Sequence, residues 1–164
     1  MTGATYPPIE QLLPHRPPMI LIDRLVEATE QEGTCEVTIT PQSMFLEASG
    51  VPAFVGLEYM AQSVAAFGGY YSYLVNAPIT VGLLMGTRRW ETSCEFFELG
   101  QTLRIHVSHI WGKHELMRFH CTITSEAASE PLLQQADLSV FKPRALQAYL
   151  EEIDHDNSGT SQRC

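Results

Sequence analysis

Hydrophobic residues are densest between positions 51 and 75, and this stretch predicts one long helix. Apolar residues fall on every side of the predicted helix, which is typical of a helix buried on all faces. Gly68 and Gly69 are small enough to let a sheet approach the helix backbone closely. Pro52 suits a first helical turn, where its missing N–H costs nothing. We therefore expect a buried helix over residues 52–75, around which the rest of the chain is arranged.

Alternation of apolar and polar residues predicts strands on both sides of this helix. Cys35, Val37 and Ile39, for example, alternate with polar neighbours. Alternation predicts strands at residues 34–40, 102–111 and 115–124. Strand-like stretches are also predicted at 19–28, 80–97 and 133–141, and further helices at 9–13 and 144–153. Gly86 lies inside one of these strands, where a glycine commonly marks a bend or a bulge.

One long helix and a meander of antiparallel strands predict an α+β fold in a single domain. We place this domain at residues 1–153 and expect the polar tail, residues 154–164, to be disordered. The sequence offers no second helix of similar length to cover an edge of the sheet. Pairing with a second subunit would cover it, so we expect a homodimer or a higher oligomer.

Composition and charge narrow the classes of function. The net charge is −9 and no dense basic stripe occurs, which argues against direct nucleic-acid binding. The four cysteines form no CxxC pair, so neither a metal site nor a cofactor is expected. The longest apolar run is interrupted by charged and polar residues, and no signal peptide is recognisable at the start. We therefore expect a cytoplasmic protein with no membrane-spanning segment.

Glu58 is the residue of the central helix that most needs an explanation. A carboxylate inside an apolar helix is costly unless it is hydrogen-bonded, protonated or used in chemistry. Gln62 lies one turn later on the same face and could orient Glu58 or a substrate. Two plainer interpretations stay open: Glu58 is a hydrogen-bonded structural carboxyl group, and Gln62 joins the helix to the sheet.

Four stretches occur in the order found in one known family. They read Leu-Pro-His-Arg-Pro at 13–17 with Met-Ile-Leu-Ile-Asp-Arg at 19–24, Gly-Leu-Glu-Tyr-Met-Ala-Gln at 56–62, Leu-Gly-Gln-Thr-Leu at 99–103, and a last strand ending at Phe141. Together they resemble the hotdog-fold 3-hydroxyacyl-acyl-carrier-protein dehydratases. The helix motif is most similar to the ApeP-like branch, which is associated with aryl polyene synthesis. The resemblance covers most of residues 9–141.

This resemblance implies a hotdog fold, in which a curved antiparallel sheet wraps one buried helix. It implies dehydration of 3-hydroxyacyl thioesters carried on acyl carrier protein, in fatty-acid or aryl polyene synthesis. Glu58 matches the family carboxyl group that protonates the departing hydroxyl. The family's partner histidine lies in a Gly-His-Phe-Pro segment before the helix, whereas the corresponding residues 43–52 contain no histidine. When the family's catalytic residues are matched one by one to this sequence, Glu58 corresponds to the acid and no residue corresponds to the base.

His15 is our candidate for the missing base. It lies in a stiff connector next to Pro14 and Pro17, inside the motif expected near the substrate tunnel. A single histidine is a weak catalytic signal, so an anchoring role for His15 through backbone hydrogen bonds stays open. His109 shares a strand face with apolar residues and is expected to be a satisfied core histidine.

The start of the central helix is a candidate substrate-binding site. Free N–H groups and the positive end of the helix dipole could bind the thioester carbonyl near Val55 and Gly56. Carrier proteins are acidic, so docking of one to this acidic chain needs a local basic patch. The candidate docking residues are Arg16, Arg88, Arg89, Lys142 and Arg144.

Two other functions remain open. The missing Gly-His-Phe-Pro histidine is compatible with a non-catalytic subunit that pairs with an active second dehydratase in a hetero-oligomer. An acyl thioesterase, in which Glu58 activates water or attacks the thioester, is also compatible, because some hotdog thioesterases rely on a helix carboxylate without a histidine.

Overall fold

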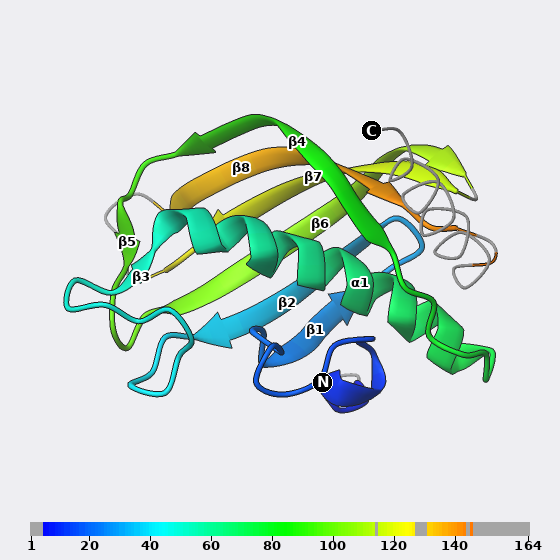
Figure 1. Ribbon diagram of the computed structural model, residues 1–164, viewed down its shortest axis with the longest axis horizontal. Helices are drawn as coiled ribbons and strands as arrows, with labels where there is room; N and C mark the ends of the chain where they lie inside the picture. Colours follow the sequence, from blue (N-terminus) through cyan, green and yellow to red (C-terminus); the bar gives the residue numbers. More distant parts are fainter. Residues whose placement is uncertain (1–4, 114, 127–130, 144, 146–164) are drawn as a thin grey trace, which may run out of the picture.

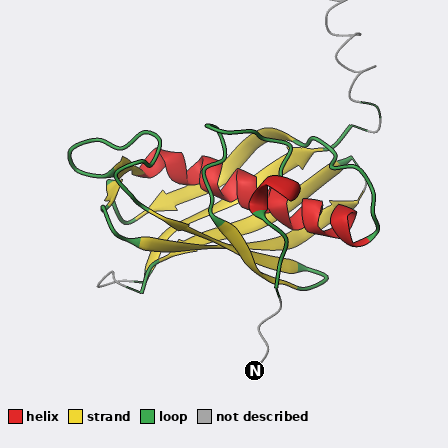
Figure 2. Ribbon diagram, turned by 90° about the horizontal axis from the view of Figure 1, so that it is seen from below, coloured by secondary structure: helices red, strands yellow, loops and turns green. Residues whose placement is uncertain are grey.

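A curved antiparallel sheet wraps one long helix in the computed structural model, which describes residues 5–113, 115–126, 131–143 and 145 (Figures 1 and 2). The helices are η1 (Ile9–Gln11), η2 (Ala53–Val55) and α1 (Gly56–Leu74). The strands are β1 (Arg24–Ala28), β2 (Glu32–Thr38), β3 (Val51–Pro52), β4 (Leu83–Thr92), β5 (Phe96–Phe97), β6 (Thr102–Lys113), β7 (Leu116–Thr124) and β8 (Leu132–Phe141). The α+β prediction is therefore confirmed, with one helix packed on one large sheet.

The main sheet has six strands in the order β1-β2-β6-β7-β8-β4, and all of its pairs are antiparallel. In the strands that alternate, every second side chain points to the concave face of the sheet. Leu103, Ile105 and Val107 of β6 show the pattern clearly, because each is no more than 1% exposed. Met60 and Phe67 of α1 are buried in the same core. The core therefore lies between α1 and the sheet.

The helix begins later than the sequence predicts, at Gly56 instead of Pro52. Pro52 instead belongs to β3, where it pairs with Phe96 of β5. This long-range pairing takes precedence over the local preference of proline for a first helical turn. A 3-10 turn at Ala53–Val55 then joins β3 to the helix.

The prediction that the helix is buried on all faces is also wrong for this chain by itself. Met60, Val64 and Phe67 are buried, whereas Gly68, Tyr73 and Leu74 are exposed. The reason is that, among the described residues, the large sheet packs against one side of α1 and leaves the other side open. Within the described residues, no helix is both long enough and apolar enough to cross a membrane.

Two predicted strands are shorter than the sequence pattern suggests. The first begins at Arg24 instead of Met19. In the connector before it, the backbone amide of Leu21 bonds to the Gln62 side chain of α1 and not to a neighbouring strand. The predicted strand at 80–97 divides into β4 and β5, and the β4–β8 register shifts near Gly86, as expected for a glycine in a strand. The predicted helix at 144–153 and the tail at 154–164 fall outside the described residues, apart from the single position 145.

Strand β4 forms one edge of the sheet and is exposed along almost its whole length. Leu84, Met85 and Trp90 are 44%, 61% and 38% exposed, so this edge carries more apolar surface than an edge facing water needs. Such surface is typical of an interaction site.

The cysteines give a prediction that tests the core. Burial raises the pKa of Cys35 to about 12, despite a hydrogen bond with Ser63 that lowers it. Burial also raises the pKa of Cys121, whereas Cys94 is only half-buried. Since the thiolate is the reactive form, iodoacetamide should label Cys94 in the folded protein and spare Cys35 and Cys121. Peptide mass spectrometry checks this, and equally fast labelling of Cys35 and Cys94 would contradict the packing.

Candidate active site

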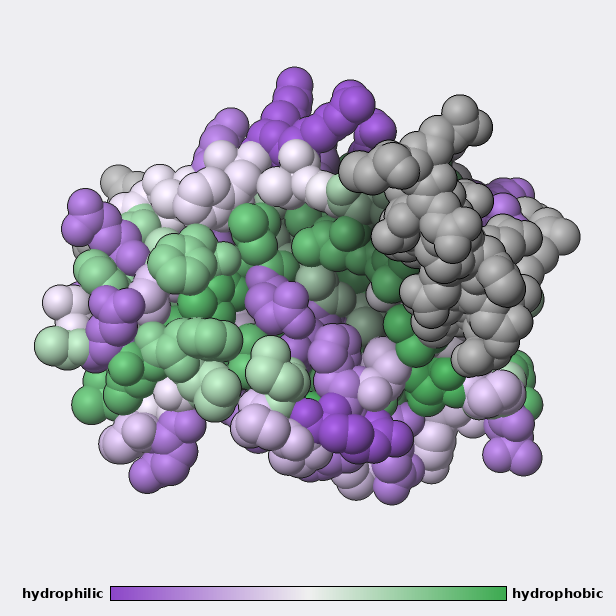
Figure 3. Space-filling view, viewed as in Figure 1, coloured by the Kyte–Doolittle hydropathy of each residue, from purple (hydrophilic) through white to green (hydrophobic). Residues whose placement is uncertain are grey.

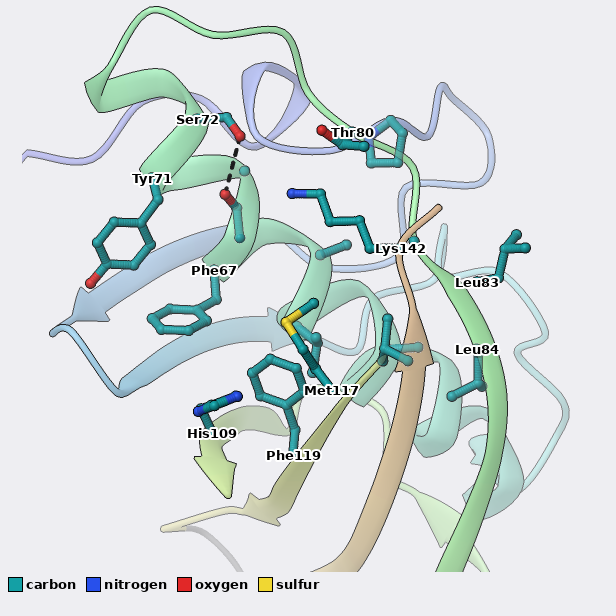
Figure 4. A pocket seen from close by; sticks show the side chains of 18 of the residues that line it. Phe67, Tyr71, Ser72, Thr80, Leu83, Leu84, His109, Met117, Phe119 and Lys142 are labelled. Atoms are coloured by element: carbon teal, nitrogen blue, oxygen red, sulfur yellow. Dashed lines mark hydrogen bonds between the residues drawn. The ribbon is translucent and has the colours of Figure 1, made fainter. Parts of the chain in front are cut away.

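A cavity of about 560 Å³ lies beside α1. The surface is hollowed in this region, with apolar side chains gathered around the hollow (Figure 3). Figure 4 shows how side chains from α1, β4, β6, β7 and the end of β8 surround the space. The residues that the argument uses are His15, Glu58, Phe67, His109, Phe119 and Lys142, all of which line this cavity.

The structure brings His15 and Glu58 together in the cavity wall. His15 Nε2 lies 3.8 Å from Glu58 Oε1, and the two side chains are 32% and 40% exposed. This separation is too long for a direct hydrogen bond, but a proton can pass between the two groups after a small movement. The expectation that Glu58 is buried is wrong for this chain by itself, because its carboxyl group faces the cavity.

The connector holds His15 in this position. Arg16 bonds through its guanidinium to the backbone oxygens of Leu13 and His15, at 3.2 and 2.7 Å. His15 Nδ1 is buried and has no hydrogen-bond partner within the described residues. The anchoring role that the sequence left open therefore belongs to Arg16, and the imidazole of His15 remains available at the cavity.

Gln62 fixes the position of Glu58. Its Nε2 donates hydrogen bonds to Glu58 Oε1 at 2.9 Å and to the Met19 carbonyl oxygen at 2.7 Å. Its Oε1 accepts a hydrogen bond of 2.8 Å from the Leu21 amide. Gln62 thus orients the carboxyl group of Glu58, and it joins α1 to the connector after His15 instead of to the sheet, because its partners Met19 and Leu21 precede β1.

We expect Gln62→Met to destabilise the protein and to release Glu58. Gln62 is fully buried, so the substitution leaves the Leu21 amide and the Met19 carbonyl without a partner. Each buried group left unpaired costs roughly 1–3 kcal/mol, so the free energy of unfolding should fall by about 2 kcal/mol or more. Urea denaturation measures the change, and an unaltered midpoint would contradict this role.

The structure places Val55 and Gly56 away from the cavity. Val55 is 5% exposed in the core, and a Cβ on Gly56 would lie 2.1 Å from Gln134 Oε1. The Gly56 amide already bonds to the carbonyl oxygens of Ala53 and Phe54. Neither residue lines the cavity. The structure therefore gives no support to binding of a thioester carbonyl at this helix start.

His109 is placed differently from the sequence prediction. It lies on the inward row of β6, as its alternation indicates, but it lines the cavity and its buried Nε2 has no partner within the described residues. It is therefore not a satisfied core histidine. The sequence pattern identified its face correctly, but periodicity cannot distinguish a cavity wall from a filled core.

The family model described as ApeP-like, ApeP dehydratase, matches residues 7–151. The chain belongs to the ApeP-like dehydratase family. This confirms the resemblance inferred from the Glu58–Gln62 helix motif and the connector motif. A comparison with curated proteins found no match.

Solved structures show the same fold. The dehydratase heterocomplex ApeI:P from Xenorhabdus doucetiae is similar with a TM-score of 0.81 at 22% identity, over 89% of this chain and 97% of that chain. A hypothetical thioesterase with coenzyme A from Streptococcus pneumoniae TIGR4 is similar with a TM-score of 0.57 at 9% identity, over 73% and 84%. The Escherichia coli PaaI protein from the phenylacetic acid degradation operon gives 0.53 at 10%, over 71% and 80%. The fold is therefore the one shared by hotdog dehydratases and thioesterases.

Proposed function

We propose that this ApeP-like dehydratase converts 3-hydroxyacyl thioesters carried on acyl carrier protein into enoyl thioesters. The observation that carries the proposal is the group at the cavity wall. Glu58 is held by Gln62, and His15 Nε2 lies 3.8 Å from the same carboxyl group. Elimination across C2 and C3 needs a base and an acid side by side, and this pair supplies both.

The proposed reaction uses one proton shared by the pair. With this proton on Glu58, neutral His15 removes a proton from C2 of the substrate. The C2–C3 double bond forms as the C3–O bond breaks, and Glu58 protonates the hydroxyl group, which leaves as water. Transfer of the new proton from His15 to Glu58 then restores the starting state. Gln62 donates to Glu58 Oε1, the oxygen 3.8 Å from His15 Nε2, and so holds the carboxyl group in place for the return of the proton.

Basic residues support a carrier-linked substrate. Lys142 lines the cavity, and its side chain is directed toward the α1 side of the pocket (Figure 4). Arg88 and Arg89 lie on the exposed strand β4. In a chain with a net charge of −9, these cations are suited to the phosphate of a phosphopantetheine arm and to an acidic carrier protein. Arg144 lies outside the described residues.

The exposed edge at β4 favours a second candidate function, that of a subunit paired with another dehydratase. Its exposed apolar residues would be covered in such a pair. The segment before β3 carries no histidine, and the structural relative from Xenorhabdus doucetiae is described as a heterocomplex. A homodimer would cover the same edge.

Two assays on the purified chain separate the candidates. The first follows enoyl formation from a 3-hydroxyacyl carrier protein, and the second follows release of free thiol from the same substrate. Enoyl product without thiol supports the proposal, and thiol release supports a thioesterase. If the folded chain forms neither product by itself, but enoyl product appears when a second dehydratase is added, the subunit function is supported instead.

A further inference from the structure

His109 lies where β6 departs from regular pairing. The inward row of β6 runs from Leu103 through Ile105 and Val107 to His109. The β6–β7 register then shifts between His109 and Trp111. Bulges of this kind redirect a strand and often occur beside active sites. The aliphatic row of β6 thus ends in an imidazole at the wall of the cavity.

The surroundings of His109 are aromatic. Its ring packs edge-to-face on Phe119, with the ring centres 5.3 Å apart, and Phe119 packs in the same way on Phe67 at 6.4 Å. The three rings lie together at one part of the cavity (Figure 4). Phe67 is nine residues beyond Glu58 on α1, which is about 14 Å along the helix axis at 1.5 Å per residue. Through Phe119, His109 is thus packed toward the part of α1 that lies about two and a half turns beyond Glu58.

His109 Nε2 is an unpaired nitrogen in this apolar part of the cavity. A buried polar atom without a partner costs free energy, and a ligand that pairs with it recovers that cost. The Tyr71 hydroxyl, which also lines the cavity, is already used, since it donates to the Thr29 carbonyl oxygen. Met117 lines the cavity next to Phe119 along β7, and its flexible side chain can yield to an entering chain.

We propose that His109 is a specificity-determining residue whose Nε2 hydrogen-bonds an oxygen of the bound thioester at the Phe67 end of the cavity, away from the reacting carbons. The inference rests on the proposed function only in that the cavity takes an acyl thioester. Such an oxygen has two sources, a polar group far along the acyl chain or an amide of the pantetheine arm. In either case the ligand oxygen pairs with His109 Nε2, whereas a plain hydrocarbon leaves this nitrogen without a partner.

Binding of unreactive analogues tests this without requiring turnover. In these analogues an amide replaces the thioester. One has a plain alkyl chain on the short amine counterpart of N-acetylcysteamine, the second adds a distal hydroxyl to the alkyl chain, and the third carries the plain chain on the full-length amine counterpart of pantetheine. Each is titrated calorimetrically against wild type, His109→Phe and His109→Gln. His106→Phe is the matched control, because His106 is on the same strand but outside the residues that line the cavity.

We expect His109→Phe to bind one of the two analogues with an additional distal polar group about three- to tenfold more weakly, the usual range for one net hydrogen bond. Which analogue is affected identifies the source of the oxygen. Binding of the plain analogue should not change, His109→Gln should recover part of the loss, and His106→Phe should match wild type. Equal binding of all three analogues by His109→Phe and wild type would overturn the proposal. An equal loss for all three analogues would also overturn it, because that result indicates a role in packing alone.

Discussion

Replacement of Glu58 by glutamine is expected to lower kcat for dehydration by about a thousandfold, within the range usual for loss of a general acid. The amide has nearly the same shape as the carboxyl group but cannot protonate a leaving hydroxyl. The side chain is 40% exposed at the cavity, so its substitution should alter the free energy of unfolding little. Stopped-time assays of enoyl formation, together with urea denaturation, separate loss of chemistry from loss of fold.

Glu30→Gln is the matched control for this variant. Glu30 is a second carboxylate at the same cavity, on the turn between β1 and β2 and outside the proposed acid–base group. We expect its variant to retain turnover within a few-fold of wild type. If Glu58→Gln were as active as Glu30→Gln, Glu58 would not be the acid.

Two neighbouring glycines of α1 are expected to respond oppositely to substitution by alanine. A Cβ on Gly69 would lie 1.9 Å from the Leu12 carbonyl oxygen, and backbone atoms cannot rotate away as a flexible side chain can. Overpacking of this kind costs roughly 1–3 kcal/mol or more, so we expect Gly69→Ala to lose about 3 kcal/mol of unfolding free energy. A Cβ on Gly68 meets no atom within 4 Å. Gly68→Ala should therefore gain up to about 1 kcal/mol from helix propensity.

Urea denaturation of the two variants under identical conditions measures the difference. The close approach of α1 to the turn at Leu12 positions the connector that carries His15. A Gly69→Ala protein as stable as Gly68→Ala would show that this approach is looser than the structure indicates.

Local pattern was enough to predict the main elements of the fold. Alternation located the inward rows of β2, β6 and β7, and the apolar run located α1. Long-range pairing explains the differences. Pro52 lies in β3 because it pairs with Phe96, 44 residues along the chain. The bulge after His109 re-aims the end of β6, and Trp111 beyond it is 60% exposed.

The candidate site was predictable in its residue types more than in its geometry. The helix motif identified Glu58 and Gln62, and the proline-rich connector suggested His15. The structure then places His15 beside Glu58, although its role as the base stays a proposal. The bonds of Gln62 to Met19 and Leu21 span 43 and 41 residues, and sequence periodicity contains no information on such contacts.

The most direct test of this account is the rate of enoyl formation by His15→Gln, measured beside wild type and Met44→Leu. Glutamine keeps a donor at the position of Nε2 but cannot accept the C2 proton. Met44 lies in the segment where the related dehydratases carry their histidine, and it does not line the cavity. The account predicts a loss of about a hundredfold or more for His15→Gln and wild-type turnover for Met44→Leu. Wild-type turnover by a folded His15→Gln protein would contradict it, and the base would then have to be sought elsewhere.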